Sequence, residues 1–205
     1  VKVPIRILLL LGLAILFWAS AFVGIRSALE SYSPQALALL RFLIASFILG
    51  IYALIIKMPF PKKSDIPFFA LAGFVGITLY HLCLNIGEQT VTAGTSSFLV
   101  SAVPIFTALF SLFILKQKLN KWGWFGILIS FSGIALISFS ESGFGTLNTG
   151  TLLVLMAACS GSLYVIFQKR LLEKYTPLEV ASYTFWFGTF FMLIFIPQLI
   201  HDIQI

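Results

Sequence analysis

The sequence predicts an all-α integral membrane protein with seven transmembrane helices. Composition, the length of the apolar runs and the placement of the charges lead to this fold class. Of the 205 residues 60% are hydrophobic, 10% are charged and 22 are Phe, whereas about 25% of the residues of a soluble domain are charged. So few polar side chains could not cover a soluble globule, and the lipid bilayer is therefore the expected surrounding of the chain.

Seven apolar runs have about the length that an α-helix needs to cross a hydrocarbon core about 30 Å thick. The predicted helices are 7–29, 34–56, 66–86, 94–115, 122–139, 151–168 and 177–200. The first run could also be a cleavable signal peptide, because basic residues precede it and Ala19-Ser20-Ala21 resembles a cleavage site. Its apolar stretch continues to Ala28, beyond the usual h-region of about 7 to 15 residues, and this favours a retained helix.

The basic residues predict the orientation of the helices. Eleven of the thirteen lie on alternate connections, namely Lys2, Arg6, Lys57, Lys62, Lys63, Lys116, Lys118, Lys121, Lys169, Arg170 and Lys174. Short cytoplasmic loops are enriched in Lys and Arg. We therefore expect a multi-pass protein of the cell (inner) membrane with a cytoplasmic N-terminus, and no nucleic-acid partner.

An internal repeat relates two parts of the chain that lie 143 residues apart. The segment LESYSP at 29–34 returns as LEKYTP at 172–177, Ala38 and Phe42 align with Ala181 and Phe185, and Arg26 aligns with the similar Lys169. Ser-Pro and Thr-Pro are ordinary helix starts, with a hydroxyl N-cap and Pro at the first helical position. Helix-start chemistry explains only two of the eight matched positions, so we interpret the match as a repeat.

The repeating unit contains five helices, and an odd number inverts the second copy across the membrane. Inverted repeats are typical of secondary transporters that work by alternating access. Two units would need about 2 × 143 = 286 residues, so we expect a ten-helix protein of which this chain is a fragment. The predicted organisation is a first five-helix repeat at 1–139, an extracytoplasmic connection at 140–149 and an incomplete second repeat at 150–205.

Several stretches resemble the EamA-type branch of the drug/metabolite transporter superfamily. They are FWASAFVGIRSAL in the first helix, SPQALALLRF in the second, NIGEQTVTAGTSSFLVSAVPIFTALF through the fourth and LNKWGWFGILISFSGIALI in the fifth. The resemblance implies ten helices in two inverted repeats and the transport of small metabolites, often amino acids or their derivatives. One departure is Gln117, where many members of that family have Glu.

Polar residues inside the spans are candidates for the transport pathway, because such groups are costly in lipid. Arg41 lies seven residues into the second helix, about 10 Å deep. It either pairs with Glu30 or Glu88, or it anchors an anionic group of a substrate. In the third helix Thr78, His81 and Asn85 share one face, so this helix is expected to form a wall of the pathway. A hydrogen-bonded packing role for His81 is equally consistent with the pattern.

Two further groups complete the candidate residues. Small residues on one face of the fourth helix, Gly94, Ser97, Ser101, Pro104 and Ser111, predict close packing or a gate, with a bend at Pro104, and Ser101 is also a pathway candidate. Trp18 and Trp186 fall near the centres of their helices. With Tyr164, Gln168 and Tyr183 they predict an aromatic, hydrogen-bonding central cavity, although core packing would explain the same residues.

The sequence contains no motif for a catalytic residue set, a metal site or a cofactor. The predicted function is secondary transport, in the direction of export, of neutral or zwitterionic small molecules across the plasma membrane. The alternatives are a membrane scaffold or assembly subunit and an intramembrane enzyme. A homodimer is a possible assembly.

Overall fold

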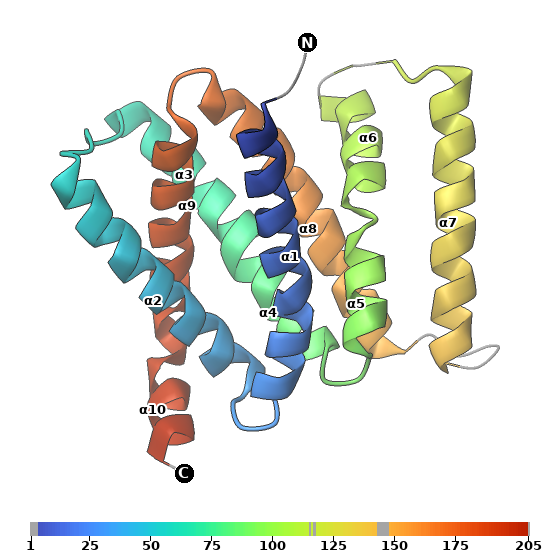
Figure 1. Cartoon of the computed structure of the whole chain (residues 1–205), viewed down its shortest axis with the longest axis horizontal. Coiled ribbons are helices and arrows are strands. Elements are labelled where there is room, and N and C mark those ends of the chain that lie inside the picture. The colour runs from blue at the N-terminus through green and yellow to red at the C-terminus, as the bar shows by residue number, and fades with distance from the viewer. Residues whose placement is uncertain (1–3, 115, 117, 143–147, 205) are drawn as a thin grey trace.

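The computed structural model is a bundle of helices (Figure 1). It describes residues 4–114, 116, 118–142 and 148–204, and at 134, 135 and 137–142 only the helical backbone. The helices that form one span each are α1 (Ile5–Ala28), α2 (Pro34–Ile55), α7 (Lys121–Ser142) and α8 (Thr149–Leu172). The broken spans are η1 (Lys63–Asp65), α3 (Ile66–Gly73), η2 (Phe74–Leu79) and α4 (Tyr80–Gly87), then α5 (Ala93–Val100) and α6 (Val103–Ile114), and last α9 (Pro177–Met192), η3 (Leu193–Phe195) and α10 (Ile196–Gln204).

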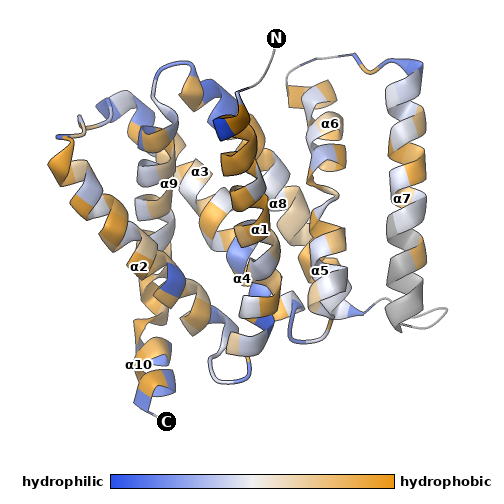
Figure 2. Cartoon of the chain, viewed as in Figure 1, coloured by the Kyte–Doolittle hydropathy of each residue, from blue (hydrophilic) through white to orange (hydrophobic). Residues whose placement is uncertain are grey.

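The structure confirms an all-α membrane protein. Each of the seven predicted runs contains helix. Over the described residues six of these spans are long and apolar enough to cross a bilayer, and α7, which contains the predicted run 122–139, is not one of the six. Hydrophilic residues gather at the helix ends and in the connections, while the helices are largely hydrophobic (Figure 2). The ten-helix inverted repeat stays a prediction, and Lys2, Gln117 and residues 143–147 of the predicted connection lie outside the described residues.

Proline explains where two of the predicted spans break. The run 94–115 was expected as one bent helix, but α5 ends at Val100 and α6 begins at Val103. Pro104 cannot donate a hydrogen bond to the Val100 carbonyl, and its ring clashes with that carbonyl. Pro197 has the same relation to Leu193, the residue at which α9 gives way to η3. The bend expected at Pro104 is therefore present as a complete interruption of the helix.

Close helix packing positions the third span, α8 and α9 around one another. Gly76, in the π-helical segment η2, lies directly against Tyr164 of α8, so that an added Cβ would be 2.3 Å from the Tyr164 ring. Gly188 of α9 lies against Ile77 in the same way, with an added Cβ 2.4 Å from the Ile77 Cβ. These glycines let the backbones approach where any side chain would hold them apart. By contrast α1 is at the periphery, with only 6% of its most apolar window buried.

In both copies of the repeated turn the residue before the proline donates its N–H and its hydroxyl to a carboxylate, but the carboxylates come from different places, and only in the second copy does the hydroxyl also accept from the helix, from the Glu179 N–H. In the second copy the Thr176 backbone N–H and hydroxyl both donate to Oε2 of Glu179, at 2.7 and 2.8 Å, within one helix start. In the first copy the Ser33 N–H and hydroxyl both donate to Oδ2 of Asp202, at 2.7 and 2.6 Å. Residue 36, which aligns with Glu179, is Ala, so the distant helix α10 supplies the missing carboxylate.

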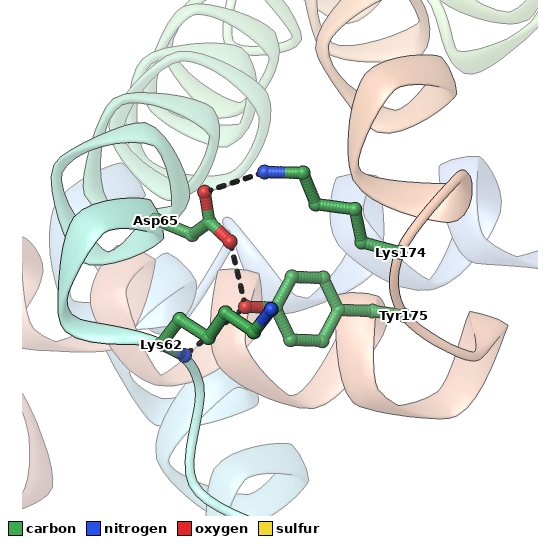
Figure 3. Close-up of polar contacts among 4 residues, drawn as sticks. All are labelled: Lys62, Asp65, Lys174 and Tyr175. Carbon is green, nitrogen blue, oxygen red and sulfur yellow. Dashed lines mark hydrogen bonds and ion pairs between the residues drawn. The ribbon is translucent and has the colours of Figure 1, made fainter.

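A polar cluster ties the connection before α3 to the turn after α8 (Figure 3). Lys174 pairs with Asp65 at 2.9 Å, and the Tyr175 hydroxyl donates to the same carboxylate at 2.8 Å while it accepts from the Lys62 N–H at 3.0 Å. Loss of hydration raises the pKa of Tyr175 above its usual value, so its hydroxyl keeps its proton at neutral pH. The cluster therefore links these two connections at one end of the bundle.

Candidate functional site

A cavity of about 520 Å³ lies between α1, α2, the third span, α6, α8 and α9. Its walls combine one cation, several aromatic rings and a side-chain amide with small and aliphatic residues. The lining residues are Trp18, Arg41, Phe42, Ala45, Gly76, Ile77, Tyr80, His81, Val103, Gly161, Tyr164, Val165, Gln168 and Phe185. Five of the residues predicted for the pathway, Trp18, Arg41, His81, Tyr164 and Gln168, thus come together in one place.

Arg41 is the cation of this cavity. Its Nη1 atom is buried and has no hydrogen-bond partner, and among the described residues no carboxylate lies within 4 Å of the guanidinium group. Glu88 attracts Arg41 electrostatically, but the ion pair with Glu30 or Glu88 that the sequence allowed is not formed. A buried guanidinium nitrogen without a partner is costly, because its hydration has not been replaced. A bound anionic group would remove that cost.

Aromatic side chains hold the polar groups of the cavity in place. The His81 ring packs between Phe42, at 4.5 Å between centroids, and Tyr80, at 4.8 Å. Its Nδ1 atom is buried and has no hydrogen-bond partner. Across the cavity the Tyr164 hydroxyl lies 3.0 Å from the Thr184 hydroxyl. The cavity therefore presents flat apolar surfaces beside a small number of polar atoms, as small-molecule sites usually do.

Thr78 and Asn85 lie outside the cavity, in contacts between helices. The Thr78 hydroxyl donates to the Gly188 carbonyl at 2.9 Å, and the Asn85 amide donates to the Pro34 carbonyl at 2.9 Å. Thr78 lies in the π-helical segment η2, where a turn takes more residues than an α-turn, so its side chain is rotated away from the face that an ideal helix would share with His81. Asn85 lies one turn beyond His81 in α4 and reaches the start of α2 instead of the cavity.

Tyr183 and Trp186 also lie away from the cavity, on the other side of α9. The Tyr183 hydroxyl donates to the Pro59 carbonyl, and the Trp186 indole N–H donates to the Ser46 carbonyl at 3.1 Å. Both residues line two other grooves, near the connection that follows α2. They satisfy their polar atoms with backbone carbonyls, as the core-packing alternative expects.

The small face predicted in the fourth span is divided by the helix break. Ser101 is exposed, and its hydroxyl donates to the Phe98 carbonyl of the preceding helix α5. A Cβ added to Gly94 would have only the Thr92 hydroxyl oxygen within 4 Å. Pro104 and Ser111 line an adjacent cavity of about 460 Å³, which shares Val103 and Val165 with the candidate cavity and also includes Lys118 and Leu119 of the connection to α7. Ser97 is half-buried in α5.

Sequence reasoning did not select several aromatic residues of the cavity. Phe42 and Phe185 were already matched by the repeat, and a search for repeated residues within the spans would have selected both. Tyr80 carries a weaker signal, namely an aromatic ring adjacent to the histidine of the third span. Gly76 and Gly161 have no signal in a single sequence, because their role is to admit Tyr164 and Tyr80 closely to the backbone.

Among the described residues no group of three or more His, Cys, Asp or Glu side chains could hold a metal ion. The two cysteines, Cys83 and Cys159, are free. The described part of the cavity contains no carboxylate or thiol that could serve as a nucleophile. The lining residues can bind a small molecule through charge, aromatic contact and hydrogen bonds.

Comparisons with known proteins relate the chain to membrane transporters. The family model of the EamA-like transporter family matches residues 5–139 and 148–204. The chain is 43% identical over 198 residues to the uncharacterized transporter YdfC of Bacillus subtilis, covering 97% of this chain and 65% of YdfC. It is 37% identical over 191 residues to a probable terminal-alkyne amino-acid exporter of Streptantibioticus cattleyicolor, covering 93% of this chain and 64% of that protein.

A third relative is the uncharacterized inner membrane transporter YedA of Escherichia coli. The identity is 30% over 154 residues, which cover 73% of this chain and 49% of YedA. The chain thus spans less than two thirds of the length of these three relatives. No solved structure matches it.

Proposed function

Because the chain belongs to the EamA-like transporter family, we propose that it is part of a secondary transporter that exports small organic molecules with a carboxylate and an apolar portion, by alternating access. The proposal includes a cytoplasmic N-terminus and a location in the cell (inner) membrane, as the distribution of the basic residues predicts. Amino acids and their derivatives have the required chemistry. The named amino-acid exporter among the relatives agrees with this substrate class.

The unpartnered guanidinium of Arg41 is the observation that carries the substrate class. A substrate carboxylate could accept hydrogen bonds from Arg41 in the bidentate geometry that guanidinium and carboxylate groups favour. The rings of Trp18, Tyr80 and Tyr164 surround the space beside it, where the apolar portion of the same molecule would lie. Gln168 adds donors and an acceptor for an amino group or a backbone-like amide.

Two contacts support the alternating movement of inverted repeats. Phe42 packs against Phe185 with 5.2 Å between ring centroids, and the Ser46 hydroxyl lies 2.7 Å from the Thr189 hydroxyl. Both pairs are separated by 143 residues, which is the offset of the sequence repeat. Two equivalent residues of a repeat touch each other only near an axis that relates the copies. The crossing of α2 and α9 is therefore the proposed pivot of the movement.

Transport by the full-length protein with a changed Arg41 tests the proposal. We would reconstitute wild type, Arg41→Gln, Arg41→Lys and the control Arg170→Gln in liposomes and compare amino acids with their carboxamide analogues. Arg170 lies at the end of α8 over the Phe68 ring, outside the cavity, so its substitution should leave the KM values unchanged.

A hydrogen-bonded interaction with a charged group contributes about 1.5 to 3 kcal/mol. We therefore expect Arg41→Gln to raise the KM for carboxylates by about 10- to 100-fold, to leave the KM for carboxamides nearly unchanged, and to be only partly rescued by Arg41→Lys. An equal loss for carboxylates and carboxamides would assign Arg41 a purely structural role and contradict the proposed substrate class.

A further inference from the structure

Two adjacent grooves lie where α2 and α9 diverge, on the side of the bundle that holds the connection after α2. Their volumes are about 660 and 550 Å³. Three aromatic residues, Phe60, Tyr183 and Trp186, line both grooves and thus form the ridge between them. Phe60 is 96% exposed, which is unusual for a large apolar side chain unless lipid or a partner surrounds it.

The groove walls are apolar because their polar atoms are already bonded. The Trp186 indole donates to Ser46, and the Tyr183 hydroxyl donates to Pro59, so both rings present only their carbon faces. The larger groove follows α2 from Ser46 to Lys57, a distance of about 16 Å at 1.5 Å per residue. A groove of this length and character fits an extended hydrocarbon chain.

One lysine borders each groove. Lys57 lines the larger groove and Lys63 lines the smaller one. Lys57 ends α2 with a left-handed backbone, at φ 51°, while the Met58 N–H bonds back to the Ala53 carbonyl at 2.9 Å. This helix ending directs the chain away from α2 and over the grooves.

The acidic groups near these two lysines have other partners. Asp65 pairs with Lys174 and accepts from Tyr175, and Glu179 accepts from Thr176. Within the part of the chain that the structure describes, neither Lys57 nor Lys63 has a carboxylate within 4 Å. Each of the two apolar grooves is therefore bordered by a lysine without a carboxylate partner.

We propose that the paired grooves bind one anionic phospholipid, with its phosphate between Lys57 and Lys63 and one acyl chain in each groove. Phe60 lies between the two chains in this arrangement. Basic pockets between transmembrane helices at the cytoplasmic face have the chemistry for anionic headgroups, and the positive-inside rule places these lysines at that face. A zwitterionic lipid could fill the grooves, but its headgroup would not neutralise the two lysines.

Fluorescence of Trp186 reports on groove occupancy. In the full-length protein, Trp18, Trp122 and Trp124, and any tryptophan outside this sequence, would be replaced by Phe so that Trp186 is the only tryptophan. The protein would be reconstituted with phosphatidylglycerol or phosphatidylcholine that carries bromine on its acyl chains, which quenches tryptophan on contact. The proposal predicts half-maximal quenching at an about tenfold lower mole fraction of the anionic lipid.

Substitution of the lysines separates a specific site from general lipid contact. Lys57→Gln with Lys63→Gln should make the two lipids quench equally, at the mole fraction that phosphatidylcholine needs in the parent protein. Unchanged quenching by phosphatidylcholine shows that the grooves remain folded. The matched control Lys116→Gln with Lys121→Gln, at another connection rich in lysine, should keep the preference.

Three outcomes would overturn the proposal. Equal quenching by both lipids in the parent protein would mean ordinary annular lipid. No quenching by either lipid would mean that protein fills the grooves. Loss of the preference in the control variant as well would mean that net charge, rather than Lys57 and Lys63, attracts the anionic lipid.

Discussion

Substitution of Gly76 by Ala should destabilise the protein and distort the candidate cavity. The added Cβ would lie 2.3 Å from Cγ and Cδ2 of Tyr164 and 2.7 Å from its Cβ. The Tyr164 Cβ is fixed to the backbone of α8, so the ring cannot avoid the new methyl group by a rotamer change alone. Either α8 moves away from η2 or the ring moves into the cavity that it lines.

The size of this effect follows from two contributions. Overpacking costs about 1 to 3 kcal/mol, and a displaced Tyr164 would lose its hydrogen bond with Thr184, which is worth about 1 kcal/mol. We therefore expect a loss of about 2 to 4 kcal/mol, which lowers the Tm of a chain of this size by about 4 to 16 °C. The control is Gly24→Ala, because nothing lies within 4 Å of a Cβ added to Gly24 in α1.

Thermal unfolding of the full-length protein in detergent, followed by size-exclusion chromatography, measures these differences. Gly76→Ala combined with Tyr164→Ala should lose less stability than the sum of the two single losses, because the contacts with the ring are removed and only the contact with the Cβ of residue 164 remains. If Gly76→Ala melted as the wild type does, or if Gly24→Ala lost as much stability, the close packing of η2 against α8 would be refuted.

Three further predictions concern contacts outside the cavity. Cysteines at Ser46 and Thr189 should form a disulfide on oxidation whichever way the transporter faces, because a contact on the pivot persists in both states. Failure to cross-link in one state would contradict the pivot. Asp65→Ala should lower the Tm more than Lys174→Ala does, because the loss of Asp65 also removes the acceptor of the Tyr175 hydroxyl, whereas an exposed ion pair alone contributes at most about 1 kcal/mol. Equal Tm values for the two variants would contradict this order. Asp202→Asn should lower the Tm by an amount that corresponds to about 1 kcal/mol, the value of a helix cap. Ser33→Ala added to Asp202→Asn should lower the Tm little further. Fully additive losses of Tm would show that the two residues act separately.

The sequence predicted the positions of the helices well, but of their interruptions it predicted only the one at Pro104. The predicted run 34–56 and the observed α2 differ by one residue at the C-terminal end. Pro197 is a comparable signal that was not used for the last span. The π-helical segment in the third span, where Gly76 packs against α8 and Ile77 against α9, has no such signal in the sequence.

The candidate site was only partly predicted. Arg41 and Trp18 lie on unbroken helices, and the cavity contains both. Thr78 lies in the π-helical segment and Asn85 lies one turn beyond His81, and both donate to backbone carbonyls of neighbouring helices. Tyr183 and Trp186 have the residue types of a cavity wall, but which side of α9 faces the cavity depends on packing that no single sequence records. Their roles in transport stay predictions.

The central claim is that the space beside Arg41 is part of an aqueous transport pathway. The most direct test is the labelling of a single cysteine at Gln168 by a membrane-impermeant thiol reagent, in full-length protein whose Cys83, Cys159 and any other cysteine are replaced. Lys174→Cys, at an exposed turn, serves as the positive control, and Asn85→Cys, in a buried helix contact, as the negative control. We predict that the cysteine at Gln168 reacts from at least one side of the membrane and is protected by an amino acid that is transported. A cysteine at Gln168 that stays unlabelled from both sides, while the one at Lys174 reacts, would contradict the claim.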